Sequence, residues 1–140
     1  MIVSDDPMPD FAHQPLVPAV ASPGGFVQQI TLNEGRLPVG RIVWFLPAHD
    51  DGVMQILELQ VDPAHRRQGH ASRLLDEAIA QARLLCKRRG IHLRRTWVAV
   101  EQKSQIIARA FLTRHGYHHT STAANLLKNQ DVLVYQKAWE

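Results

Sequence analysis

The sequence predicts an α+β fold with a mixed, mostly antiparallel sheet, a central parallel β-α-β unit and two main helices. Three observations favour it: alternating apolar residues mark three successive strands, a long stripe with helical period follows them, and a strand, a shorter helix and two last strands complete the chain. A chain of 140 residues with 45% hydrophobic content is long enough for one packed domain and too short to argue for two.

The first strands come after a proline-rich start. Residues 1–24 hold five of the eight prolines and show no sustained period, so we expect an extended or mobile arm followed by a single domain over residues 25–140. Strands are predicted over residues 26–32 and 39–46, joined by the Gly- and Pro-marked turn "NEGRLP". After "HDDG" a third strand, residues 53–61, completes an antiparallel meander.

The third strand has a two-sided pattern. Leu57, Leu59 and Val61 alternate with Glu58 and Gln60. Because side chains of a strand point alternately to its two faces, this pattern predicts one buried face and one more polar face.

The strongest helix follows this strand. Its apolar residues recur at intervals of three and four, as one stripe of an amphipathic helix does: Ala71, Leu74, Leu75, Ala78, Ile79, Ala82, Leu85 and Cys86. Gly90 is predicted to end the helix, and the Lys-Arg-Arg run before it places cations at the negative end of the helix dipole.

The remaining elements complete a sheet. A buried strand is predicted over residues 96–100, a second helix over 104–114, and two more strands over 117–123 and 131–139. Two strands separated by a long helix are usually parallel neighbours, so the strand over 96–100 should lie parallel to the strand over 53–61. The predicted sheet is therefore mixed.

The composition predicts the cellular compartment of the protein and the kinds of ligand that it can bind. The single cysteine, Cys86, cannot build a disulfide framework, and its place on the helical apolar face predicts a buried, inert thiol. No segment approaches the roughly 20 unbroken apolar residues of a membrane span, and the acidic, proline-interrupted start is unlike a signal peptide. We expect a cytoplasmic protein with no membrane partner, and the net charge of +3 favours anionic ligands.

The stretch from Val61 to Leu75, "VDPAHRRQGHASRLL", joins the third strand to the long helix. A helix start exposes backbone N–H groups and carries partial positive charge, so it is suited to bind an anion. Gly69 allows close approach of backbone amides, Ala71 keeps the first turn thin, and Ser72 adds a hydroxyl donor. Three arginines add charge: Arg66, Arg67 and Arg73. The pattern indicates a pyrophosphate site, with an ordinary basic surface turn as the alternative.

The order of these elements resembles the GNAT superfamily of N-acetyltransferases. "R-x-x-G-x-A" (Arg66, Gly69, Ala71) after "LQVDP" looks like the acetyl-CoA motif of that family, and "QIIARAFLTRHGY" is similar to its later helix. The resemblance covers about residues 26–139 and points to a short version without the usual N-terminal helix pair, with the α/β three-layer GNAT-like fold. It implies transfer of an acetyl group from acetyl-CoA, as co-substrate, to an amine acceptor.

The resemblance also implies a set of CoA-binding residues. The backbone of Leu59 and Val61 would bind the pantetheine arm as an added strand, and the loop amides would surround the pyrophosphate. Gln105 stands where many relatives have an asparagine that contacts CoA. The full set implied is Leu59, Val61, Arg66, Arg67, Gln68, Gly69, His70, Ala71, Ser72, Arg73 and Gln105.

Candidates can be assigned for some of the catalytic groups that acetyl transfer needs, but not for all of them. The backbone N–H near Val61 would stabilise the oxyanion, and Glu58 is the candidate base, with a solvent-facing strand glutamate as the alternative reading. Glu101 is a second candidate base. Leu112 occupies the position where many relatives carry the tyrosine that protonates the CoA thiolate, so no general acid is assigned. The spacing of the histidines gives no metal site.

Two other functions compete with an N-acetyltransferase acting on a primary amine. Leu112 and the missing helix pair favour a non-catalytic acyl-CoA-binding or sensor module. The arginines favour a nucleic-acid-binding domain, but no aromatic platform or nucleic-acid motif accompanies them. The missing helices would form one wall of the acceptor pocket, and we therefore hypothesise a homodimer whose second subunit completes it.

Overall fold

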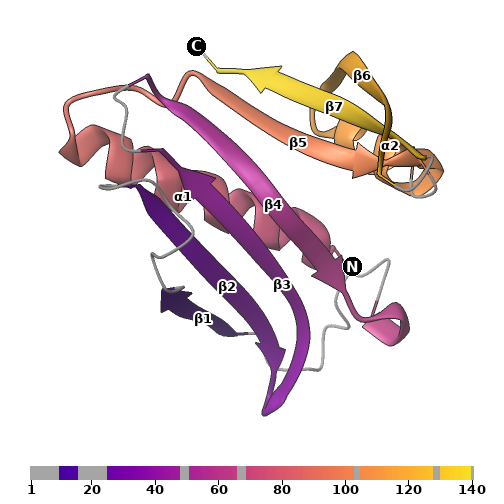
Figure 1. Cartoon of the computed structure of the whole chain (residues 1–140). Helices are drawn as coiled ribbons and strands as arrows, with labels where there is room; N and C mark the ends of the chain where they lie inside the picture. Colours follow the sequence, from indigo (N-terminus) through magenta and orange to yellow (C-terminus); the bar gives the residue numbers. More distant parts are fainter. Residues whose placement is uncertain are drawn as a thin grey trace.

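Seven strands form one sheet in the order β1-β2-β3-β4-β5-β7-β6 (Figure 1). The computed structural model describes residues 10–15, 25–47, 51–65, 69–102, 105–127 and 130–139. The elements are β1 (Asp10–Pro15), β2 (Phe26–Glu34), β3 (Leu37–Leu46), β4 (Val53–Val61), the 3-10 helix η2 (Pro63–His65), α1 (His70–Arg88), β5 (Arg95–Glu101), α2 (Gln105–Arg114), β6 (His118–Leu127) and β7 (Gln130–Ala138).

The predicted fold class is confirmed. β2, β3 and β4 form an antiparallel meander, and α1 connects β4 to its parallel neighbour β5. β7 then pairs antiparallel with both β5 and β6. α1 packs against β2, β3 and β4, whereas α2 packs against β5. The parallel pair therefore lies at the centre of a mostly antiparallel sheet.

The edge strand β1 is an element that sequence patterns did not reveal. Its backbone pairs with β2 from Asp10 opposite Asn33 to Pro15 opposite Gln28. Proline is tolerated here because an edge strand leaves one row of N–H groups without a ladder partner. These residues belong to the predicted arm, and six of them extend the sheet. Where the folded domain begins stays a prediction.

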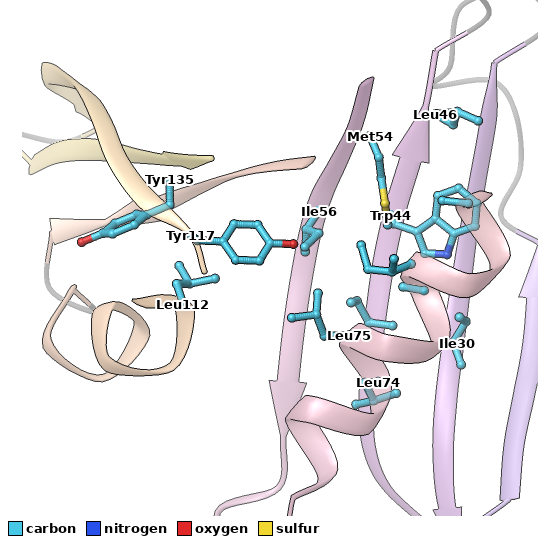
Figure 2. Close-up of a cluster of buried hydrophobic side chains, with 14 of the residues drawn as sticks. Ile30, Trp44, Leu46, Met54, Ile56, Leu74, Leu75, Leu112, Tyr117 and Tyr135 are labelled. Atoms are coloured by element: carbon cyan, nitrogen blue, oxygen red, sulfur yellow. The ribbon is translucent and has the colours of Figure 1, made fainter. Parts of the chain in front are cut away.

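Helix α1 supplies most of the helical part of the core, as its apolar stripe predicts. Its buried side chains include Leu74, Leu75 and Cys86, and the two leucines belong to one core cluster with Trp44 and Ile56 of the sheet (Figure 2). The helix ends at Arg88, and Gly90 follows with a φ of 75°. Burial raises the pKa of the Cys86 thiol, in agreement with the inert thiol that was predicted.

Strand β4 contains an irregularity at Leu57. Ile56 and Glu58 pair with two consecutive residues of β3, so Leu57 between them is an extra residue, a β-bulge. The prediction that Leu57 shares a buried face with Leu59 and Val61 is wrong, because the bulge reverses the side-chain alternation and leaves Leu57 47% exposed. Leu59 and Val61 pack against the core as predicted.

Candidate active site

The first turn of α1 is built to face an anion. The residue before it, Gly69, has a φ of 79° in the left-handed region, and no side chain of the described residues hydrogen-bonds to the helix start as a cap. The Arg73 N–H donates to the Gly69 carbonyl over 3.1 Å and is the first amide with an acceptor one turn earlier, whereas a helix start directs the amides before it out of the helix end. The first turn, residues 70–73, contains no acidic side chain to compete for those amides. A phosphate is the ligand that this arrangement favours.

His70 is the first residue of α1, and its side chain lies between the helix start and the sheet. Its side chain is fully buried, and its Nε2 lies 3.8 Å from Glu34 Oε2 of β2. Burial is the largest influence on its pKa and lowers it below 6.5, although the nearby Glu34 acts in the opposite direction. The imidazole is therefore neutral at pH 7. Its contribution is to anchor the helix start on the sheet rather than to add charge.

Ser72 ties this turn to the end of α2. Its Oγ lies 2.9 Å from His115 Nε2, directly after the last residue of α2. The His115 ring also packs against Phe111 in a tilted arrangement, with ring centroids 4.5 Å apart and an interplanar angle of 47°. Burial lowers the pKa of His115, so this imidazole is neutral as well. The start of α1 and the end of α2 thus lie side by side.

Beside this turn the two central strands separate. β4 and β5 pair over only four positions, from Val53 with Arg95 to Ile56 with Val98. Beyond them, residues 58–61 stay paired with β3 and residues 99–101 with β7, and the two strands diverge (Figure 1). The bulge at Leu57 stands where the separation begins. An extended chain could pair with backbone groups along these separated edges, as an added strand does.

An ion pair lies next to the bulge. The Arg41 guanidinium donates from Nη2 to Glu58 Oε1 over 2.7 Å. The two side chains are 46% and 31% exposed, so both heads stay accessible to solvent. The predicted base therefore has a cationic partner.

Two other side chains lie close to the separation of the strands. Leu112 is 5% exposed and belongs to the core, so no proton donor stands at that position. Tyr117 is 1% exposed, and its phenol points toward Ile56 of β4 (Figure 2). Burial, only partly offset by the nearby Thr96 hydroxyl, raises the pKa of Tyr117 to about 12. The phenol is protonated throughout the neutral range.

The family model of the acetyltransferase (GNAT) domain matches residues 29–119, which include the separated strands and the start of α1. The chain belongs to the GNAT acetyltransferases. It is an acetyltransferase enzyme, and the family membership inferred from its acetyl-CoA motif is confirmed.

Solved structures of other GNAT proteins share the fold of this acetyltransferase. A putative GNAT acetyltransferase from Desulfovibrio desulfuricans superposes with a TM-score of 0.68 at 17% identity, covering 80% of this chain and 69% of that one. An IAA acetyltransferase from Bacillus cereus gives 0.68 at 14% identity, covering 93% and 100%. Arabidopsis thaliana Naa50, in complex with the bisubstrate analogue CoA-Ac-MVNAL, gives 0.64 at 22% identity, covering 79% and 72%. Among curated proteins, no sequence matches.

The predicted site residues of this GNAT acetyltransferase fall into three groups. The helix start brings together Gly69, His70, Ala71, Ser72 and Arg73, while Leu59 and Val61 lie in the separated part of β4. Arg66, Arg67 and Gln68 lie outside the described residues, as does the side chain of Gln105, whose backbone begins α2. Sequence patterns missed Arg41, which is 17 residues from Glu58 and is brought to it only by the β3–β4 register.

A separate hollow of about 390 Å³ lies between α1 and β7. Its cations are already engaged: Lys137 donates to the His115 carbonyl over 2.8 Å, and Arg83 stacks 4.5 Å above the Trp139 ring. Asp76 adds a negative charge to its lining. The helix start is therefore the better anion site of the two.

Neither a metal-binding cluster nor a membrane-spanning helix occurs in the described part of the chain. Within it, no three His, Cys, Asp or Glu side chains come together as a metal ion would require. No helix there is both long enough and apolar enough to cross a bilayer.

Proposed function

We propose that this acetyltransferase transfers the acetyl group of acetyl-CoA to a primary amine, of a small molecule or a peptide, by direct attack. The observation that carries the proposal is the separation of β4 from β5 beside the uncapped start of α1. The first offers backbone edges to an extended arm, and the second offers amides to a phosphate at its end. The cytoplasmic location expected from the single cysteine is part of the proposal.

The binding roles follow this layout. The pyrophosphate would lie against the amides of residues 69–72, with the Arg73 side chain close to its oxygens and with Arg66, Arg67 and Gln68 contributed by the preceding segment. Glycine at position 69 suits this role because its left-handed φ orients the turn, and apart from its chain neighbours no atom of the described residues lies within 4 Å of where a Cβ would be. The pantetheine arm would pair with the backbone of Leu59 and Val61, and Gln105 would contact it from the start of α2.

The chemistry needs few side chains. The neutral amine attacks the thioester carbonyl and forms the C–N bond, and the resulting oxyanion is stabilised by the backbone N–H near Val61. Collapse breaks the C–S bond. The excess proton on the nitrogen of the tetrahedral intermediate passes either to Glu58 or water, with solvent then protonating the thiolate, or directly to the leaving thiolate, since Leu112 offers no proton. The products are the neutral amide and CoA.

The test combines binding with turnover. Calorimetry should show acetyl-CoA binding, and a CoA-release assay should show transfer with at least one class in a panel of polyamines, aminoglycosides, amino acids and peptide N-termini. Absence of CoA binding refutes the site, and binding without amine-dependent CoA release in any class refutes the reaction.

A non-catalytic acyl-CoA-binding or sensor module is the second candidate. It is favoured by Leu112, a buried apolar residue where many relatives have a proton donor. It predicts CoA affinity with no turnover across the same panel. Acetylated product from a single amine class would exclude it.

We further propose a homodimer whose second subunit completes the acceptor site. By sequence, β1 and β2 are ten residues apart, fewer than two helices of the usual length of about 11 residues each would need. The wall that such helices would form must come from elsewhere. Light scattering of the purified chain should give twice the 15.8 kDa protomer mass, and a monomer with full amine turnover contradicts the idea.

A further inference from the structure

The face of β2, β3 and β4 opposite α1 carries two opposite charges. These strands contain three charged residues, Glu34, Arg41 and Glu58, and Glu34 reaches toward α1. Ile42 and Leu59 pair with each other and belong to or pack against the core on the α1 side. Because side chains alternate along a strand, Arg41 and Glu58 point to the opposite face. Their pair thus stands among uncharged positions of these strands.

The position of the pair is as informative as its isolation. Glu58 directly follows the bulge, where β4 begins to separate from β5. Helix α1 covers the other face of β4, so an acceptor reaches this point from the face that carries the pair. An ion pair this exposed contributes only about 0–1 kcal/mol to the stability of the fold. Stability alone is therefore a poor explanation for its presence.

We propose that Arg41 and Glu58 select an acceptor that carries its own carboxylate next to the amine, as a free amino acid does. This inference rests on the proposed function and names the acceptor class of that same site. The amine would face Glu58 and the carboxylate would face Arg41. Arg41 is then a specificity residue of the acceptor site.

Charge complementarity supports this class over simple cations. A polyamine approaching Glu58 meets the positive charge of Arg41 at 2.7 Å from the carboxylate, which cancels much of the attraction. An amino acid gives each group a partner, because its carboxylate pairs with Arg41 while its neutral amine donates a hydrogen bond to Glu58. Its amine and carboxylate are separated by one carbon, which matches two opposite charges in direct contact.

Matched acceptors test the inference. Amino acids and their primary amides would be compared at equal concentrations of neutral amine, with wild type, Arg41→Gln and Arg95→Gln. Arg95 is the control, because it is exposed, lies on β5 and bonds Gln136 over 3.2 Å. Wild type should prefer the amino acid by about tenfold in kcat/KM, the effect of one charge-assisted hydrogen bond at a partly exposed site. Arg41→Gln should remove the preference through a higher KM for the amino acid, whereas Arg95→Gln should keep it.

The outcomes separate the inference from the proposed function. Equal use of acid and amide by wild type overturns the inference alone, as does an equal loss with both acceptors in Arg41→Gln, which would make Arg41 a positioning residue for Glu58. CoA binding without transfer to either acceptor class, or to any other amine, overturns the proposed function and the inference with it. Unchanged CoA affinity in Arg41→Gln serves as the folding control.

Discussion

Glycines at the two ends of α1 allow the anion site to be tested against a matched control. Gly69 precedes the helix with a φ of 79°, and Gly90 follows it with a φ of 75°. At both positions an added Cβ would meet no atom within 4 Å among the described residues other than its chain neighbours. Gly69→Ala and Gly90→Ala therefore impose the same conformational cost and no clash. Only the first changes the turn that presents amides to a phosphate.

The expected magnitudes follow from that difference. An alanine forced into the left-handed region costs about 1 kcal/mol more than glycine, so each variant should lower the Tm by about 3 °C. If the Gly69 turn shifts, one backbone hydrogen bond to the charged pyrophosphate is lost or weakened, at about 1.5–3 kcal/mol. The Kd for CoA should then rise by about tenfold to a hundredfold in Gly69→Ala and stay unchanged in Gly90→Ala.

Calorimetric titration with CoA and thermal denaturation give both quantities on the same samples. Equal Kd values in the two variants, together with equal losses of Tm, would refute the assignment of the pyrophosphate to the start of α1. A Tm loss confined to one variant would refute the conformational reasoning instead.

Three further predictions concern buried groups. Burial lowers the pKa of His70 below 6.5, so the unfolded chain takes up the proton first and the free energy of unfolding should fall as pH drops below 6.5. Urea titrations between about pH 7 and pH 5 should show a smaller fall in His70→Gln, and equal slopes would contradict this. Burial raises the pKa of Tyr117 to about 12, so ultraviolet titration of Tyr117→Phe should lose an ionisation near pH 12 and none near pH 10. Gly40→Ala brings a Cβ to 2.9 Å from the Gln60 carbonyl oxygen and 3.1 Å from Leu74 Cδ1, which should cost about 1–3 kcal/mol in denaturant unfolding, and an unchanged midpoint would show that the neighbours yield freely.

The elements that sequence alone predicts are those with a strong local period. The stripe of α1 and the meander of β2, β3 and β4 each encode their buried face in neighbouring residues, and the structure confirms them. β1 carries no such signal, because two of its six residues, Asp10 and Pro15, are poor strand formers. Its strand conformation comes from pairing with β2.

The site is predicted in part for the same reason. The motif around Gly69 is contiguous, so its place at the start of α1 could be read from the chain. The bulge at Leu57 could not, because an extra residue in one strand is defined only by its pairing with the next. The contacts between Arg41 and Glu58 and between Ser72 and His115 join residues 17 and 43 positions apart, and only the folded register brings them together.

The four residue pairs that join β4 to β5 have a mechanical consequence. These four pairs join the two parts of the sheet, the four strands β1 to β4 and the three strands β5 to β7. A substrate arm that pairs with both separated edges would extend this short seam. We therefore expect hydrogen exchange of the backbone amides in β4 and in β5 to slow together when CoA binds. The bound cofactor would then hold the two halves of the sheet together as well as donate the acetyl group.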